Sequence, residues 1–316
     1  MCETAESLIE NLYYMNTGTP KPSDRFYHAQ INGGWTCEKR FFENVSRKGL
    51  NYLPGFMMFT RTAEMFENGD EMQYVCVFFH HDCNALVHIT KKLLQVPFFH
   101  EVYCVNYSQE VDNWTDMGGY EYGPRESTTI CRPNYNYARY DGAAESFTED
   151  TESNFLANFK PKRPSVGRKI RSVPEDYNRY FGWLSYNQLQ ELYAERFFIQ
   201  VVLRGYKAPM QDFDAFIKID NQWEIVEIKQ KDADIQNNGQ ERFGWDAHRL
   251  ALYLYIMHHT SFGGRYVISE IGDREDRNHL QWLYISIEHM LQNLNWGGVR
   301  SGTLMLPKSS FTRLNM

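Results

Sequence analysis

The sequence predicts a protein of the α/β (α+β) class, with a central mixed sheet flanked by helices and a β-rich region before it. Three observations predict this class. The chain has 316 residues, of which 42% are apolar and 16% aromatic, enough for one large or two ordinary domains. Short runs of β-branched and aromatic residues alternate with polar turns in the first half. In the second half the periodicities follow the order helix, hairpin, helix, strand, strand.

Residues 1–145 are expected to form the β-rich region, a recognition or assembly module. A short helix is predicted in the first 15 residues, where Leu8, Leu12 and Met15 recur at helical spacing. The rest, up to about residue 140, is predicted to be mainly strand with one or two helices. Its aromatic and β-branched runs cover 55–59, 73–79 and 98–107.

The cysteines indicate a reduced protein without a metal site. All six precede residue 132 and none forms a C-x-x-C pair, so free thiols are expected. A metal site around residues 80–83, which read His-His-Asp-Cys, is the alternative, but the ligand pairs that make zinc specific are missing. Strand and turn residues are the favoured interpretation there.

Residues 146–180 are predicted to be a linker or a basic loop. Apolar density falls, and six basic but no acidic residues lie between Lys160 and Arg171. Two interpretations remain open, a solvated Pro-rich connector and a segment that binds a phosphate backbone. The second would use Lys162, Arg163, Arg168 and Lys169.

Residues 181–316 carry the clearest pattern and no internal sequence repeat. Ser185 and Gln188 form a capping box before a helix that continues to about Gly205. Two alternating segments, 214–219 and 223–229, are predicted to pair as a hairpin around an Asp-Asn turn. A second helix is predicted from about Arg242 to His258, followed by strands at 264–269 and 281–287.

Charge and hydropathy exclude several classes of protein. The formal net charge is -7, so no global polycation grips nucleic acid. The charge is divided, with 22 acidic and 12 basic side chains in residues 1–159 and 18 and 21 in residues 160–316. The acidic N-terminus does not resemble a secretory signal, and no window approaches a membrane span. A soluble cytoplasmic protein that contacts no membrane is expected.

Three polar residues converge on the predicted hairpin. Side chains alternate between the faces of a strand, so Glu227 and Lys229 point the same way, and an antiparallel return brings Glu227 beside Asp214. Mg²⁺ prefers carboxylate and carbonyl oxygens, which Asp214, Glu227 and the main-chain carbonyl of Ile228 can supply. The Lys229 amine can orient or deprotonate a water.

Here the sequence resembles the PD-(D/E)xK nuclease superfamily, which includes many type II restriction endonucleases. The matching residues are Pro209 to Asp214, then Glu227, Ile228 and Lys229, within a helix-hairpin-helix-strand order. The resemblance implies a restriction-endonuclease-like core over about 100 to 130 residues. It also implies that Asp214 and Glu227 hold Mg²⁺, or Mn²⁺ in its place, and that Lys229 assists the attacking water. Residues 1–170 match no pattern of this superfamily.

The sequence departs from the superfamily pattern at one place. Pro209 does not directly precede the aspartate, and Asp212 competes with Asp214 for the metal. Asp214 is preferred because it begins the alternating strand, with Asp212 as an auxiliary ligand. The preceding helix offers Glu195 or Glu191 as a further ligand, and either can equally be a solvated position. Nucleic-acid contacts are predicted at Gln230, Lys231, Arg242 and Arg249, although Arg242 and Arg249 can instead pair with Asp246 on a helix surface.

The expected function is Mg²⁺-dependent hydrolysis of double-stranded DNA by a type II restriction endonuclease, commonly a homodimer. Alternatives are a nuclease effector of another phage-defence system and a DNA-repair nuclease or resolvase. From another class, the alternative is a catalytically idle nucleic-acid-binding scaffold. The presence of all three core residues argues against the scaffold.

Overall fold

The computed structural model confirms a mixed α/β fold. It describes residues 3–15, 24–63, 72–117, 130–162, 174–272, 277–294 and 302–314. These residues fall into two compact units that alternate along the chain. The first unit comprises Met1–Thr36, Met57–Thr90 and Pro97–Gln211, and the second comprises Cys37–Phe56, Lys91–Val96 and Asp212–Met316.

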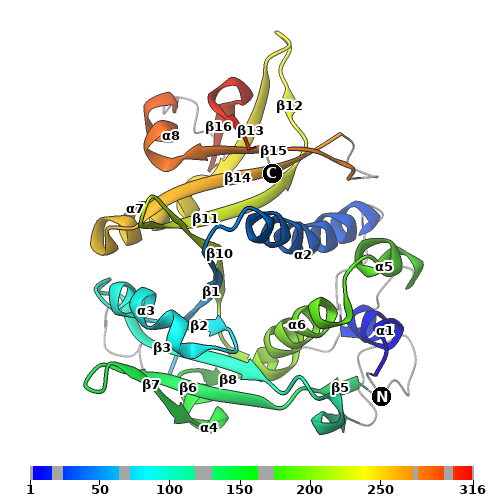
Figure 1. Cartoon of the computed structure of the whole chain (residues 1–316), viewed down its shortest axis with the longest axis vertical. Coiled ribbons are helices and arrows are strands. Elements are labelled where there is room, and N and C mark those ends of the chain that lie inside the picture. Colours follow the sequence, from blue (N-terminus) through cyan, green and yellow to red (C-terminus); the bar gives the residue numbers. More distant parts are fainter. Residues whose placement is uncertain are drawn as a thin grey trace. The chain divides into compact units, whose positions relative to one another are not determined.

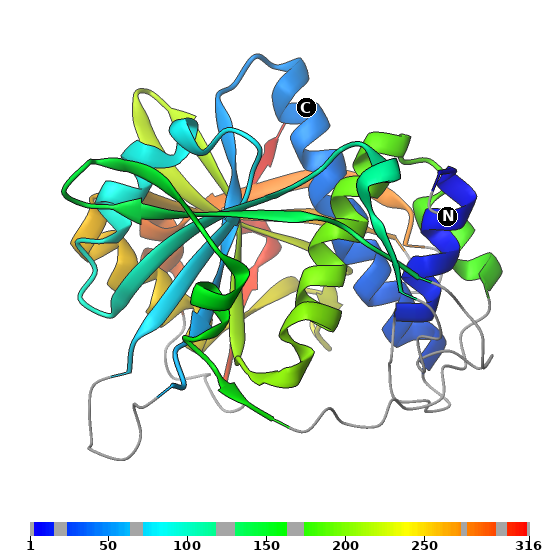
Figure 2. The ribbon, with the colours of Figure 1, turned by 90° about the horizontal axis from the view of Figure 1, so that it is seen from below.

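The first unit contains a mixed sheet and a group of helices. Its strand order is β1-β2-β3-β6-β7, antiparallel except for the parallel pair β2 and β3. Helix α1 packs against α5 and α6 (Figures 1 and 2), because Leu8, Leu12 and Tyr177 are buried in one cluster with the apolar face of α6. The bounds are α1(Ala5–Met15), β1(Tyr52–Thr60), β2(Tyr74–Phe79), α3(Val87–Leu93), β3(Phe99–Tyr107), β4(Thr115–Met117), β5(Ile130–Arg132), β6(Tyr135–Asp141), β7(Ser146–Asp150), α4(Glu152–Leu156), β8(Lys160–Pro161), α5(Pro174–Phe181), α6(Tyr186–Phe197) and β9(Tyr206–Lys207).

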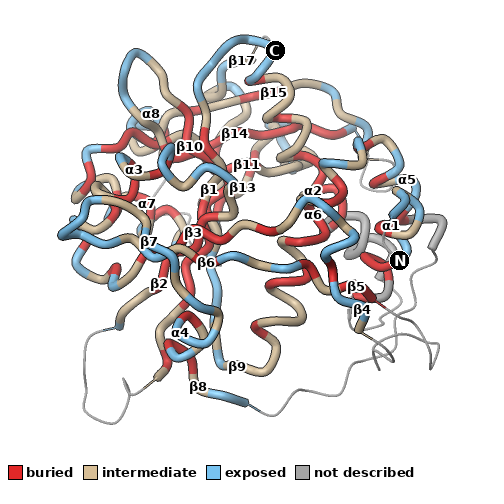
Figure 3. The backbone as a smooth tube through the Cα atoms, turned by 60° about the horizontal axis from the view of Figure 1, so that its bottom comes forward, coloured by how far each residue is buried: buried red, intermediate tan, exposed pale blue. Residues whose placement is uncertain are grey.

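The second unit is built on a sheet with strand order β17-β15-β14-β11-β10. One face is covered by residues 37–47 of α2, where Cys37, Phe41 and Val45 pack on Val226 and Ile228. Helices α7 and α8 pack at β14, whose residues are mostly buried (Figure 3). The bounds are α2(Asp24–Arg47), β10(Met210–Ile219), β11(Gln222–Lys231), β12(Asp234–Ile235), β13(Glu241–Asp246), α7(Ala247–Thr260), β14(Gly263–Ile271), β15(His279–Ser286), α8(Ile287–Asn293), β16(Thr303–Pro307) and β17(Thr312–Leu314).

Both units use the same order of strand pairings. In each, an antiparallel pair is followed by a parallel neighbour, which is reached through a connection that contains a helix (α3 or α7), and then by two antiparallel strands. The parallel neighbour of β11 places Tyr266 opposite Glu227, and that of β2 places Tyr103 opposite Val77. The sequence shows no repeat, so the repetition is one of topology.

Several sequence predictions are confirmed at the level of the element. The N-terminal helix is α1, the capping box of α6 forms as predicted, and the hairpin is β10 and β11. The one or two helices expected between residues 20 and 140 are α2, at residues 24–47, and α3, although the sequence pattern did not place them. One boundary is wrong, because residues 241–246 form strand β13 and the second helix begins at Ala247. Residues 146–162 of the predicted linker are described, and they contain β7, α4 and β8.

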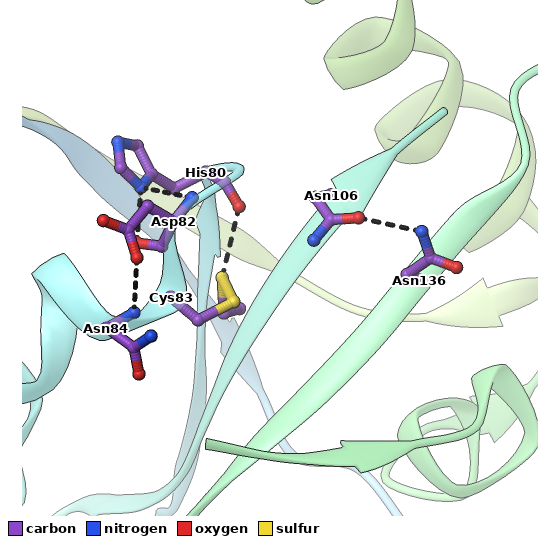
Figure 4. The surroundings of a disulfide bond; sticks show 7 residues. His80, Asp82, Cys83, Asn84, Asn106 and Asn136 are labelled. Carbon is purple, nitrogen blue, oxygen red and sulfur yellow. Dashed lines mark hydrogen bonds between the residues drawn. A yellow bond between two sulfur atoms is a disulfide. The ribbon is translucent and has the colours of Figure 1, made fainter. Parts of the chain in front are cut away.

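The prediction of free thiols is wrong for one pair. Cys83, at the start of a short 3₁₀ turn, and Cys104 of β3 form a disulfide (Figure 4). Asp82 caps that turn by accepting a hydrogen bond from the Asn84 N–H, 3.0 Å away. Of the other described cysteines, Cys37, Cys76 and Cys131 are buried and form no disulfide. In the described part of the chain, no helix is long and apolar enough to cross a membrane.

Candidate active site

The candidate site lies on the β10–β11 hairpin of the second unit. Asp220 and Asn221, which form the two-residue turn, both adopt positive φ, the conformation that a tight hairpin requires. The register pairs Ala215 with Val226, so Asp214 lies beside Glu227. Val226 and Ile228 face the cluster with Cys37, and the intervening Glu227 faces the opposite side of the sheet, toward α7.

The three predicted core residues come together. Oδ2 of Asp214 accepts a hydrogen bond from the Ile228 N–H at 2.6 Å and another from Lys229 Nζ at 3.3 Å. The same Nζ lies 2.6 Å from Oε1 of Glu227. One amine therefore bridges two carboxylates that belong to neighbouring strands.

Helix α7 completes the site with two side chains one turn apart. Arg249 places Nε 2.7 Å from Oε1 of Glu227, and its terminal nitrogen lies 2.7 Å from Oδ1 of Asp212. The Tyr253 hydroxyl donates to Oε2 of Glu227 at 2.9 Å. Arg249 was predicted as a phosphate contact, whereas here it joins two carboxylates. Tyr253 was not predicted, although its spacing of four residues from Arg249 places both on one face of the helix.

Burial makes the charges of this cluster costly, because little solvent is present to stabilise them. The Glu227 side chain is fully buried and that of Asp214 is 2% exposed, whereas Asp212 is 47% exposed. Burial, reinforced by the Glu227 charge, raises the pKa of Asp214 to about 7. Burial alone would lower the pKa of Lys229, but the charges of Asp214 and Glu227 outweigh it and raise that pKa above its ordinary value. Three carboxyl groups, of Asp212, Asp214 and Glu227, thus face the two basic side chains of Lys229 and Arg249.

The donor set suits a hard divalent cation. Among the described residues, Oε1 of Glu227 and Nε of Arg249 are buried without a hydrogen bond of normal geometry, despite their electrostatic contact. The same Glu227 oxygen also lies 2.6 Å from Lys229 Nζ, so a cation that binds it would share it with the amine and the guanidinium. No group of three His, Cys, Asp or Glu side chains in the described residues is arranged as a metal site. The predicted set differs from such a group, since it combines Asp214 and Glu227 with the Ile228 main-chain carbonyl.

Other predicted ligands lie elsewhere. Glu195 belongs to the first unit, where it pairs with Arg196 at 2.8 Å, and the Arg196 guanidinium stacks over the Trp35 ring. Glu191, on the same helix α6, also belongs to the first unit. Asp214, Glu227 and Lys229 belong to the second unit, and the participation of either glutamate in the site stays a prediction.

Most of the predicted nucleic-acid contacts have structural partners. Gln230 accepts a hydrogen bond from Arg277 Nε at 2.6 Å. Lys231 donates to the Gly244 carbonyl at 2.5 Å, and burial followed by the Lys229 charge lowers its pKa. Arg242 lies on β13 and not on a helix, 3.9 Å from Asp234. Of the basic segment, Lys162 is exposed, and Arg163, Arg168 and Lys169 lie outside the described residues.

Comparison of the chain with protein-family models, with curated proteins and with solved structures finds no match. Interpretation of the site therefore depends on its own geometry. That geometry offers a hard-cation ligand set, a bridging amine and an arginine held by two carboxylates.

Proposed function

We propose that this protein is a Mg²⁺-dependent endonuclease that hydrolyses phosphodiester bonds of double-stranded DNA. The observation that supports it is the convergence of two buried carboxylates, Asp214 and Glu227, on one lysine amine within 3.3 Å. Buried carboxylates are costly to keep without a cation or a chemical role. The resemblance to PD-(D/E)xK nucleases gives the same three residues the roles of metal ligands and water-orienting amine.

The residues divide the chemistry between them. Mg²⁺ held by Asp214, Glu227 and the Ile228 carbonyl would stabilise charge on the phosphate and lower the pKa of a bound water. Lys229 is protonated while the carboxylate charges act on it alone, so it donates a hydrogen bond and positions the water or phosphate. Once a cation shares those charges, the interactions that raise the Lys229 pKa weaken, and the amine becomes a better proton acceptor.

The type of nuclease is inferred from the whole chain. A type II restriction endonuclease fits best, because about half the chain lies outside the predicted core and is free to recognise a target or a second copy. Such an enzyme would act as a cytoplasmic homodimer on double-stranded DNA. An effector of another phage-defence system or a repair nuclease would use the same catalytic residues.

Plasmid cleavage tests the proposal. Purified protein is incubated with supercoiled plasmid in Mg²⁺, in Mn²⁺ and in EDTA, and the products are separated on a gel. We expect cleavage in either metal, none in EDTA, and a loss of at least about 100-fold in rate for Asp214→Ala, Glu227→Ala and Lys229→Ala.

Two matched variants separate catalysis from folding. Asp212→Ala removes a half-exposed aspartate at the rim, and Lys218→Ala removes a lysine from the same hairpin. Both should keep the rate within about tenfold of the wild type. Undiminished cleavage by Glu227→Ala and Lys229→Ala would refute the assignment, and an inactive Asp212→Ala beside an active Asp214→Ala would refute the choice of aspartate.

A second function, binding without hydrolysis, is favoured by one observation. Lys229, Arg249 and Tyr253 already contact both oxygens of Glu227, so the charge of that carboxylate is compensated by the protein itself. A scaffold of this kind would bind DNA, cleave nothing and take up no Mn²⁺ in calorimetry. Metal uptake that disappears in Asp214→Ala would exclude it.

A further inference from the structure

The β12–β13 ribbon is a protruding hairpin inserted between the two elements that carry the candidate site. Two residues separate Lys231, the last residue of β11, from Asp234, the first of β12, and β13 ends at Asp246, the N-cap of α7. The chain therefore passes from Lys229 through the ribbon to Arg249. Figure 1 shows the ribbon extending beyond the sheet of the second unit.

The base of the ribbon is held firmly. Lys231 and the Tyr266 hydroxyl both donate to the carbonyl of Gly244, at 2.5 and 3.0 Å. Trp245 stacks on the ring of Tyr266, and Arg242 to Asp246 of β13 pair with β16. These contacts fix the direction of the ribbon relative to β11 and β14.

The tip of the ribbon is exposed and uncharged. Residues 236–240 read Gln-Asn-Asn-Gly-Gln, four side-chain amides around a glycine at positive φ. The turn is closed by hydrogen bonds between the main chains of Gln236 and Gln240 and from the Gln240 N–H to Asn238 Oδ1. Ile235 beside it is 68% exposed, the highest fraction among the exposed large apolar side chains of the described residues.

The charges near the tip are paired at its base. Asp234 lies 3.9 Å from Arg242, and Glu241 lies 2.8 Å from Lys308. The ribbon therefore has little to offer a phosphate backbone. Amides and one aliphatic side chain are instead suited to base edges, since Asn and Gln bind adenine through two hydrogen bonds and aliphatic groups contact the thymine methyl.

We propose that the β12–β13 ribbon enters the major groove of double-stranded DNA and reads A·T pairs through Asn237, Gln240 and Ile235. This rests on the proposed function. The pairing of β13 with β16 ends at Arg242, so the hairpin from Ile235 to Glu241 has only two strands, and a two-stranded ribbon fits the groove, which is about 12 Å wide. Asn238 lies nine positions after Lys229, and at about 3.3 Å per position the chain between them spans at most about 30 Å. The bases read thus lie within about one turn of the duplex from the bond that is cut.

Selection from random duplexes tests the ribbon independently of hydrolysis. The protein used is Asp214→Asn in Ca²⁺, so that DNA is bound and not cut, and the probe is a random-sequence duplex library. We expect bound duplexes to share a preference for A·T pairs. The ribbon variant carries Asn237→Ala and Gln240→Ala in addition to Asp214→Asn, and these two substitutions leave the turn hydrogen bonds of Gln236 and Asn238 intact. In this variant the preference for A·T pairs should fall about 5- to 100-fold.

The matched control is Gln292→Ala/Asn293→Ala, which removes two exposed amides from α8. The control should keep the preference, and both pairs should keep the same dependence of affinity on salt, since base contacts release few counterions. A preference unchanged by the ribbon variant, or absent from the starting protein, overturns the proposal. Light scattering tests whether the ribbon instead joins two copies of the chain. If the wild type is a dimer and the ribbon variant is a monomer with unchanged base preference, the ribbon is a contact between copies and the proposal is overturned.

The two proposals fail in different ways. If the wild type does not cleave in Mg²⁺ but the selection shows the ribbon-dependent preference, hydrolysis is wrong and groove reading stands. If cleavage occurs without any base preference, the ribbon proposal is wrong and the nuclease stands.

Discussion

At the scale of single residues, Asp214 and Asp212 show how burial separates two aspartates two positions apart. Asp212 is half-exposed and held by Arg249, whereas Asp214 is buried beside Glu227 and accepts the Ile228 N–H. Solvent stabilises the charge of Asp212 directly. Asp214 depends on Lys229 and on whatever cation enters the site, and this difference has a measurable cost in stability.

The pKa of Asp214 predicts that the metal-free protein loses stability as pH rises. An aspartate in the unfolded chain titrates near 3.9, and in the folded protein Asp214 titrates at about 7. Between these values the folded state binds more protons, so the free energy of unfolding falls with increasing pH and levels off above about 7. Asp214→Asn removes the buried charge and should raise stability at pH 8 by on the order of 3 kcal/mol.

The measurement is denaturant unfolding in EDTA at pH 5 and pH 8. The advantage of Asp214→Asn over the wild type should be large at pH 8 and small at pH 5. Asp212→Asn, the exposed counterpart, should show no gain at either pH. Equal stability of wild type and Asp214→Asn at pH 8 would mean that Lys229 fully compensates the buried charge.

At the scale of the elements, a close contact between two strands leads to a second prediction. Gly55 is in the part of β1 that belongs to the second unit, and there β1 lies close to β10. A Cβ added at Gly55 would overlap the main-chain carbonyl of Phe213, the residue before Asp214. Main-chain atoms cannot rotate away as a side chain does, so Gly55→Ala must displace a strand. We expect a loss of at least about 3 kcal/mol in the free energy of unfolding, and weaker metal binding.

Gly205→Ala is the matched control, because a Cβ there meets no atom within 4 Å and the glycine does not have positive φ. Its stability should stay within about 1 kcal/mol of the wild type. Circular dichroism during urea unfolding compares the three proteins. A Gly55→Ala protein as stable as the control would show that β1 does not approach β10 this closely.

The elements also show what the sequence could and could not predict. The cap of α6 and the β10–β11 hairpin depend on local chemistry, so Ser185, Gln188 and the Asp-Asn turn were sufficient. One or two helices were expected between residues 20 and 140, but the position of α2 was not predicted, because two glycines and several aromatic residues obscure its pattern, although Cys37, Phe41 and Val45 recur every four residues. Strand β13 was missed because its pairing with β16 joins residues about 60 positions apart.

The site was predictable only in part, for the same reason. Asp214, Glu227 and Lys229 lie on one hairpin, where strand alternation and register decide their positions. The contacts of Glu227 with Arg249 and Tyr253 join different elements, and nothing in the local pattern of α7 distinguishes an inward arginine from a solvated one. Arg249 points inward because its charge pairs with Glu227 and Asp212, which lie on other elements.

At the scale of the whole molecule, the repeated strand order carries the Asp-Glu-Lys set in only one of its two described copies. The two sheets can be aligned by matching Val77 with Glu227, because each lies opposite a tyrosine of the parallel neighbouring strand. In this alignment Met57 corresponds to Asp214, and Phe79 corresponds to Lys229. These three counterparts are apolar and cannot hold a cation. Among the described residues, the two units thus contain one Asp-Glu-Lys set.

If the proposed function is correct, the one Asp-Glu-Lys set in the described residues predicts that a single chain cuts one DNA strand per event. Supercoiled plasmid should first become open-circular at a rate proportional to protein concentration. Linear DNA should appear later, and at a rate that rises more steeply with concentration, because cutting the second strand requires a second chain or a second visit. Gel quantification over a range of protein concentrations measures both rates, and light scattering reports the oligomeric state. Linear product formed without an open-circular intermediate by a monomeric protein would require a second catalytic centre in the same chain.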